Sequence, residues 1–342
     1  MSDVSIRVEG KAGRITLTRP QALNALNHPM CSAIDAALVE WAANDAVALV
    51  IIDGAGERAF CAGGDIAAMY HQGMAGDYDT GRAFWRDEYR MNTRLAEYPK
   101  PIVSFLHGFV MGGGVGLGGH CSHRVVGESS AISMPECGIG FVPDVGGTHL
   151  LAQAPGRLGE YLGLTGHRMG AGDAIAAGFA DLFIPEADWP AAKTALCATG
   201  DPAALEPLAA DAPAATLPRP AIDAAFGAAD LGAIKAALAE DGGAFAEATL
   251  KVLRRNAPLS MAVTLEMIRR LKGGENTIRA ALRQEYRVSH RIMQLGDFLE
   301  GVRAQIIDKD RSPRWKHAEA PVTPDAVQAM LDPLGEAELV LP

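Results

Sequence analysis

The chain has few cysteines, few aromatic residues and no long apolar run. Its five cysteines are scattered, odd in number and never spaced as C-x-x-C, which argues against a disulfide framework and a zinc site. No apolar stretch nears the ~20 residues that span a bilayer. Because the first residues enter a strand-like pattern almost at once, we expect no signal or transit peptide and a cytoplasmic location.

Basic residues are also outnumbered, with 31 Lys and Arg against 41 Asp and Glu and a net charge of −10. This balance argues against nucleic acid or an anionic membrane as the main partner, but permits a small polyanion held by a few local cations. The motifs G-x-S-x-G and G-x-x-x-x-G-K-[ST] are absent, so serine hydrolases and P-loop enzymes have no support. With 49% hydrophobic and 21% charged residues, the composition is that of an ordinary globular protein.

The first half of the chain has the pattern of an α/β fold. Alternating runs at 5–8 and 15–18 predict a hairpin, and the apolar run 47–52 predicts a buried strand. A helix between these strands has apolar residues at 34, 38 and 41, and 69–98 also has a helical composition. Since a strand at 102–106 follows, crossover connections and a parallel sheet are expected.

The second half divides by composition. Residues 1–185 form the predicted core, and residues 186–243 are rich in Ala and Pro, which is typical of a connector. Helical patterns return at 244–256, 260–272 and 277–293, so residues 244–342 are predicted to be a C-terminal helical region.

Two glycine-rich turns are the strongest chemical signal. Gly63-Gly64 and Gly112-Gly113-Gly114 each follow an apolar run of strand type. Glycines let a backbone approach a ligand closely, and two converging N–H groups can stabilise the charge on a carbonyl oxygen under attack. The alternative is that the glycines only permit tight turns. The G-x-G-x-x-G pattern at 114–119 lies mid-chain, so a dinucleotide site is not favoured.

Three carboxylates lie near these turns in the sequence. Glu136 stands among apolar residues, so burial should raise its pKa and suit it to proton transfer or nucleophilic attack; otherwise it is a helix cap or an ion-pair partner of Arg124. Asp144, in PDVGG, could act with it or only shape a turn. From its local sequence, Glu88 is best interpreted as part of a solvated helix face. The histidines at 107, 120 and 123 do not form a convincing metal set, so no metal is predicted.

Taken together, the motifs RITLTRPQALNALN, AFCAGGDI, HGFVMGGGVGLGG and MPECGIGFVPDVGG resemble the crotonase (enoyl-CoA hydratase/isomerase) superfamily. The resemblance implies a spiral of ββα units with a C-terminal helical region, an acyl-CoA substrate, a possible homo-oligomer, and no cofactor beyond the CoA of the substrate. It also implies an oxyanion hole from the N–H groups of Gly64 and Gly113. Expected CoA contacts are Leu23, Ala25, Ala62, Asp65 and Ile66.

Within that superfamily, the pattern is most similar to the 3-hydroxyisobutyryl-CoA hydrolases. A hydratase carries a catalytic glutamate three residues after the oxyanion glycine, and this chain has Gly116 there. Glu136 and Asp144 match the hydrolase pattern as catalytic residues, and Glu88 matches as a residue of the acyl pocket. We therefore expect hydrolysis of 3-hydroxyisobutyryl-CoA, a step of valine catabolism. Two alternatives remain: a hydratase or isomerase in which Asp144 or Glu88 replaces the missing carboxylate, and a non-catalytic acyl-CoA-binding protein.

Overall fold

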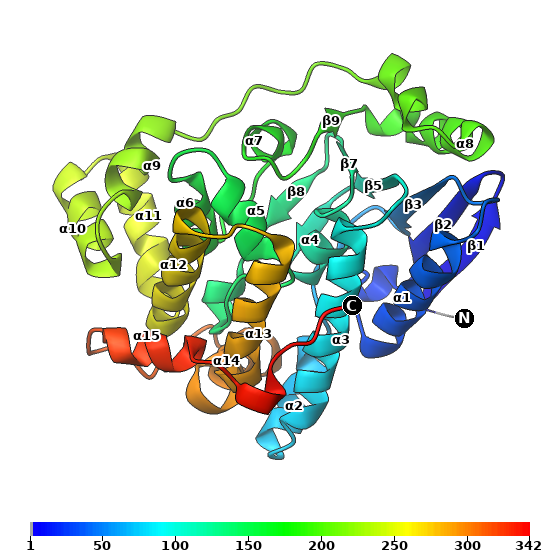
Figure 1. Ribbon diagram of the computed structural model, residues 1–342. Coiled ribbons are helices and arrows are strands. Elements are labelled where there is room, and N and C mark those ends of the chain that lie inside the picture. Colours follow the sequence, from blue (N-terminus) through cyan, green and yellow to red (C-terminus); the bar gives the residue numbers. More distant parts are fainter. Residues whose placement is uncertain (1–2) are drawn as a thin grey trace.

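The computed structural model describes residues 3–342, in which helices surround two sheets of largely parallel strands (Figure 1). The larger sheet has the order β1-β2-β3-β5-β7-β9. Its strands are β1 (Val4–Glu9), β2 (Ala12–Leu17), β3 (Leu49–Gly54), β5 (Ile102–Leu106), β7 (His123–Val126) and β9 (Leu182–Phe183). The strands β1 and β2 form the predicted antiparallel hairpin, and every other neighbouring pair is parallel.

A second, three-stranded parallel sheet consists of β4 (Ala59–Cys61), β6 (Phe109–Met111) and β8 (Ala131–Ser133). In the pairs β3/β4, β5/β6 and β7/β8, the chain adds one strand to the large sheet and the next to the small one. A helical segment follows each of these pairs. This arrangement is the predicted α/β spiral of ββα units.

Helices of the first half cover these sheets. They are α1 (His28–Ala42), α2 (Ile66–Met74), α3 (Asp79–Ala96), α4 (Gly113–Gly118), α5 (Gly147–Gln153), α6 (Leu158–Thr165) and α7 (Ala171–Ala176). The side chain of Asn27 caps α1 by accepting the N–H of Met30 at 3.0 Å, and the predicted apolar face of α1 is buried. The single helical stretch expected at 69–98 is instead two helices, because the chain turns at Gly76 with a φ of +82°.

The Ala- and Pro-rich segment is more ordered than its composition predicted. It contains α8 (Trp189–Thr199), α9 (Arg219–Phe226) and α10 (Leu231–Asp241). Between α8 and α9 an extended segment of coil crosses the top of the molecule in Figure 1. The Asp173 carboxylate holds this coil by accepting the N–H groups of Thr216 and Leu217 at 2.6 and 3.2 Å. The domain bounds 1–185, 186–243 and 244–342 stay a prediction.

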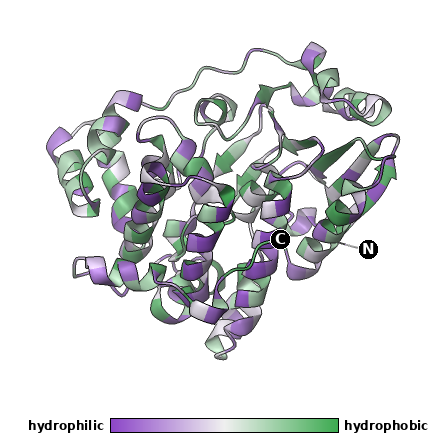
Figure 2. Ribbon diagram, in the orientation of Figure 1, coloured by the Kyte–Doolittle hydropathy of each residue, from purple (hydrophilic) through white to green (hydrophobic). Residues whose placement is uncertain are grey.

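The C-terminal region is helical as predicted. Its helices are α11 (Ala244–Arg255), α12 (Pro258–Gly273), α13 (Ile278–Leu295), α14 (Phe298–Val302) and α15 (Pro324–Leu331). Here α12 packs on α5 and α6, while α13 packs on α3 and α5, so the last third of the chain shares the main apolar core. The outer helices show mixed hydropathy, as amphipathic helices do (Figure 2). Within residues 3–342, no helix has the length and apolarity needed to cross a membrane.

Candidate active site

The three strands of the small sheet end at one edge, and each is followed by a segment of the predicted site. The first glycine turn follows β4, Gly112 and Gly113 follow β6, and Glu136 follows β8 after two residues. Parallel strands place their carboxyl ends at the same edge of a sheet, where α/β proteins commonly bind ligands. The topology therefore brings together residues that lie 72 positions apart, from Gly64 to Glu136.

The two glycine turns touch one another. A Cβ on Gly113 would lie 3.5 Å from the carbonyl carbon of Gly63, whose φ is +109°. Leu26 donates its N–H to the oxygen of Gly63 and accepts the N–H of Asp65, so the N–H of Gly64 points away from Leu26. The N–H of Gly113, the first residue of α4, has no acceptor within its own helix. Both amides are thus available for the predicted oxyanion hole.

Both Gly64 and Gly113 line a cavity of about 140 Å³ together with the three candidate carboxylates, Glu88, Glu136 and Asp144. Among the described residues that line this cavity, none is basic. Three carboxyl groups without a cation repel one another when ionised, so the cavity favours their protonated forms.

Glu136 begins the short 3-10 helix η2 (Glu136–Ile139) and is only 5% exposed. Its Oε2 has no hydrogen-bond partner within residues 3–342, whereas Oε1 lies beside Gly112, where a Cβ would come within 2.7 Å. Burial, followed by the charge of Asp144, raises the pKa of Glu136 well above its ordinary value, as predicted. The alternative ion pair with Arg124 is wrong, because Arg124 binds Asp181.

Asp144 is also buried, at 5% exposure. Its backbone oxygen closes the turn by accepting the N–H of Gly147 at 2.6 Å, which leaves the carboxyl group to accept the hydroxyl of Tyr89 at 2.8 Å. Burial and then the charge of Glu285 raise the pKa of Asp144 to about 8. Asp144 therefore shapes the turn through its backbone and also lines the cavity.

Glu88 does not lie on a solvated helix face, so that interpretation is wrong. It is 2% exposed on the inner side of α3, and its Oε1 has no partner among the described residues. A Cβ on Gly113 would lie 2.9 Å from this Oε1, so Glu88 and Glu136 flank the same glycine turn. Burial and the charge of Asp144 raise the pKa of Glu88 well above its ordinary value.

The predicted CoA contacts divide into two sets. Ala62 and Ile66 line the cavity. Leu23, Ala25 and Asp65 lie just behind it: Ala62 donates its N–H to the oxygen of Leu23 at 3.0 Å, while Arg19 binds the oxygen of Ala25 at 2.8 Å and the carboxylate of Asp65 at 3.4 Å. Their contact with CoA stays a prediction.

Sequence reasoning missed residues that hold or shape the cavity. Glu285, on α13, accepts the N–H groups of Gly146 and Thr148 at 2.7 and 3.0 Å, and its pKa is raised to about 7, chiefly by burial. No local pattern marks it, since it lies 139 residues after Gly146. Tyr89 stands next to Glu88 in FWRDEY, so that motif was the available signal for it.

Gly116, the position of the second carboxylate in a hydratase, has no room for a side chain. A Cβ there would lie 2.5 Å from Cβ of Val145 and 2.9 Å from Nδ2 of Asn92. Position 116 therefore has neither a carboxylate nor space for one.

The rest of the described structure offers weaker candidates for a metal site or an active site. Residues 3–342 hold no group of three or more His, Cys, Asp or Glu side chains placed to bind a metal ion. A larger cavity of about 810 Å³ lies between α10, α12 and α15 and contains none of the candidate carboxylates. Charged side chains on its walls are of both signs, including the ion pair of Arg270 with Glu266.

Comparison with known proteins agrees with this fold. The sequence profile of the family "Enoyl-CoA hydratase/isomerase" matches residues 12–331. The chain therefore belongs to the enoyl-CoA hydratase/isomerase family, and the predicted crotonase membership is confirmed.

Particular relatives are similar over almost their whole length. The mitochondrial 3-hydroxyisobutyryl-CoA hydrolase of Gallus gallus is 37% identical over 99% of this chain and 91% of its own, and that of Homo sapiens is 36% identical over 98% and 90%. A solved structure described as an enoyl-CoA hydratase from Rhodobacter sphaeroides 2.4.1 is 54% identical, with a TM-score of 0.92 over 99% of this chain and 100% of that one. One described as a carnitinyl-CoA dehydratase from Mycobacterium thermoresistibile is 41% identical, with a TM-score of 0.95 over 99% of both chains.

Proposed function

We propose that this protein hydrolyses a short-chain hydroxyacyl-CoA thioester, 3-hydroxyisobutyryl-CoA, to 3-hydroxyisobutyrate and CoA, as a step of valine catabolism. The observation that carries the proposal is that Gly64 and Gly113 line one cavity with a buried Glu136, whose Oε2 has no hydrogen-bond partner within residues 3–342, while position 116 has neither a carboxylate nor room for one. Hydration of a double bond needs two carboxylates on one water, whereas thioester hydrolysis needs one base or nucleophile and a polarised carbonyl. The names of the relatives support the same substrate.

In this proposal the N–H groups of Gly64 and Gly113 bind the thioester oxygen. Glu136 acts in its deprotonated form, which its raised pKa makes less abundant, and it attacks the carbonyl carbon or takes a proton from a water molecule that attacks it. In the first route the C–S bond breaks to give an acyl–glutamate anhydride and the CoA thiolate, and a water molecule then hydrolyses the anhydride and supplies the proton of the CoA thiol. In the second route the attacking water forms the acid, the C–S bond breaks, and the CoA sulfur receives the proton that Glu136 took from the water. One oxyanion donor typically contributes ~10²–10³ in kcat, so the glycine turns matter as much as the carboxylate.

Asp144 and Glu88 have supporting roles in the proposal. Asp144 positions the substrate hydroxyl or the water, and Glu88 lines the acyl pocket. No cofactor beyond the substrate's CoA takes part. A cytoplasmic location and a possible homo-oligomer also belong to the proposal, although the names of the Gallus gallus and Homo sapiens hydrolases place those proteins in mitochondria.

The direct test is release of CoA from 3-hydroxyisobutyryl-CoA, followed with a thiol reagent. All five cysteines of the protein are buried, so the reagent has little background. Glu136→Gln keeps the shape of the side chain and should lower kcat by ~10²–10⁴. The exposed Glu40→Gln is the matched control and should leave kcat unchanged. Full thioesterase activity in Glu136→Gln would end the proposal.

A second candidate is hydration or dehydration of an acyl-CoA, favoured by the description of the 54% identical structure as an enoyl-CoA hydratase. Here Asp144 or Glu88 replaces the missing carboxylate. Loss of crotonyl-CoA absorbance without CoA release would select this candidate. Binding of both thioesters without turnover would instead favour a non-catalytic acyl-CoA-binding protein.

A further inference from the structure

One wall of the small cavity is a cluster of three aromatic rings from distant parts of the chain. Trp85 on α3 stacks on Phe141 with centroids 5.3 Å apart and an interplanar angle of 16°. Phe298, the first residue of α14, lies 5.2 Å from Phe141 and 5.9 Å from Trp85. All three side chains line the cavity that holds the carboxylates. The C-terminal region thus supplies part of the wall.

The helix α14 is packed directly on the loop that follows Glu136. A Cβ on Gly301 would lie 2.0 Å from the oxygen of Ile139, and one on Gly140 would lie 2.4 Å from the oxygen of Asp297. The backbones approach this closely because one residue of each contact, Gly301 or Gly140, has no side chain. Phe298 therefore has a defined position relative to the loop that follows Glu136, because no flexible side chain separates the two backbones.

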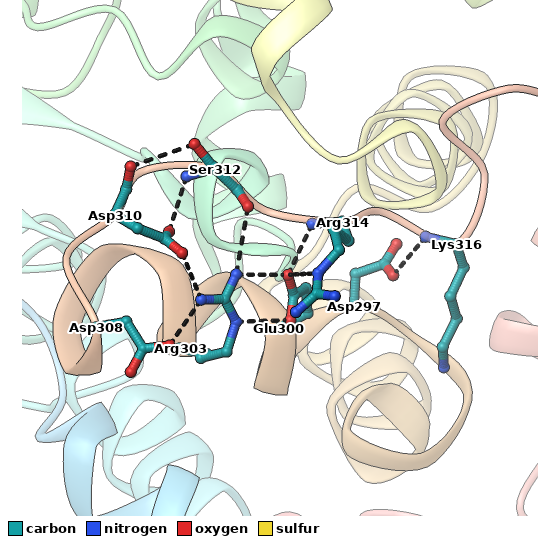
Figure 3. Close-up of polar contacts among 8 residues, drawn as sticks. All are labelled: Asp297, Glu300, Arg303, Asp308, Asp310, Ser312, Arg314 and Lys316. Atoms are coloured by element: carbon teal, nitrogen blue, oxygen red, sulfur yellow. Dashed lines mark hydrogen bonds and ion pairs between the residues drawn. The ribbon is translucent and has the colours of Figure 1, made fainter.

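A charged cluster anchors the other side of α14. The guanidinium of Arg303 donates to both carboxylate oxygens of Glu300, at 2.8 and 2.9 Å, and to Asp308 and Asp310 at 2.7 Å each (Figure 3). Glu300 also accepts the N–H of Arg314 at 2.7 Å. This network holds residues 303–314 folded back on the helix.

We propose that Phe298 is a specificity-determining residue that closes the acyl pocket and restricts the substrates to four-carbon acyl-CoA thioesters. The inference rests on the proposed function in one respect, namely that the acyl group occupies this cavity. A volume of about 140 Å³ is well below the ~300–1,000 Å³ of pockets for larger ligands. Trp85 lies on α3 with Glu88, and Phe141 lies in the segment between Glu136 and Asp144. Phe298 lies on α14, which carries none of the three candidate carboxylates, so a smaller side chain at this position leaves their elements unchanged.

The experiment compares Phe298→Leu and Phe298→Ala with the wild type on 3-hydroxyisobutyryl-CoA, 3-hydroxybutyryl-CoA and 3-hydroxyhexanoyl-CoA. The ratio of kcat/KM for the six-carbon over the four-carbon thioesters should rise at least ~10-fold in the variants, because a methylene accepted or rejected by an apolar pocket changes kcat/KM ~10–200-fold. Phe226→Leu, at another fully buried phenylalanine outside the cavity, is the control and should keep the wild-type ratio.

Binding provides a second measurement that does not depend on hydrolysis. Calorimetry with the unreactive thioethers S-butyl-CoA and S-hexyl-CoA should show wild-type preference for the shorter ligand and a smaller preference in Phe298→Leu. The inference would be overturned if the wild type bound the two thioethers equally. It would also be overturned if a folded Phe298→Leu variant had the same ratios as the wild type in binding and in turnover. Wild type that prefers S-butyl-CoA but hydrolyses no thioester would contradict the proposed function instead.

Discussion

The hydroxyl of Tyr89 donates a 2.8 Å hydrogen bond to Oδ2 of Asp144, 55 residues further along the chain. Both side chains are buried, and Tyr89 follows Glu88 directly in α3. A donor to a carboxylate stabilises its ionised form, so Tyr89 lowers the pKa of Asp144 while burial and Glu285 raise it. Tyr89 therefore both orients this carboxyl group and moderates its protonation.

Replacing Tyr89 tests this relationship. Tyr89→Phe removes only the donor, and a hydrogen bond to a charged group is worth ~1.5–3 kcal/mol, so kcat/KM for the thioester should fall by about 10-fold or more. The pKa of Asp144 should rise further, which moves its limb of the pH–rate profile to higher pH. Tyr286→Phe, whose ring centroid lies 6.2 Å from that of Tyr89, is the control. Equal losses in the two variants would assign the effect to packing rather than to the hydrogen bond.

The turn at Gly112 controls the position of Glu136. Gly112 has a φ of +48°, and a Cβ there would lie 2.7 Å from Oε1 of Glu136. Gly112→Ala should displace this carboxylate and lower kcat by about 10²-fold, a typical effect of a 1 Å misplacement.

Gly76→Ala is the matched control for that variant. Gly76 also has a positive φ, +82°, but a Cβ there would meet no atom within 4 Å. Gly76→Ala should therefore lose stability through the same backbone strain as Gly112→Ala, as measured by urea unfolding, but it should keep the wild-type kcat. Comparable kcat values for the two variants would contradict the proposed link between the turn and Glu136.

Restoring the missing carboxylate should not restore a hydratase. Gly116→Glu must place Cβ 2.5 Å from Val145, so the protein should lose stability by ~1–3 kcal/mol or more. Crotonyl-CoA absorbance should stay constant with this variant. A folded Gly116→Glu protein with clear hydratase activity would show that the space around position 116 adapts.

The raised pKa of Glu88 predicts pH-dependent stability. The folded state favours the neutral acid, so the contribution of Glu88 is complete below the ordinary glutamate pKa of about 4.3 and is lost as the pH rises through the raised pKa. Glu88→Gln cannot ionise, so its free energy of unfolding relative to wild type should increase as the pH rises above about 4.3, the ordinary glutamate pKa. Urea unfolding measures this difference, and the exposed Glu247→Gln should show no such trend.

Much of the fold was predictable because local sequence patterns specify many of its helices and strands. The apolar run at 102–106 became β5 with those bounds, and the three C-terminal helical patterns became α11, α12 and α13. The burial of Glu136 followed from its apolar neighbours. By contrast, the helices within 186–243 were missed, because Ala- and Pro-rich sequence is compatible with both coil and helix.

The sequence by itself determined the alternation of strands and helices, the two glycine turns and the acid at position 136, since strand and turn preferences act between near neighbours. Only the tertiary structure decided that Glu88 is buried, that Glu285 holds the loop after Asp144, and that Phe298 lines the cavity. Those contacts join residues far apart in the chain, and their formation depends on how whole helices pack, which no local pattern encodes.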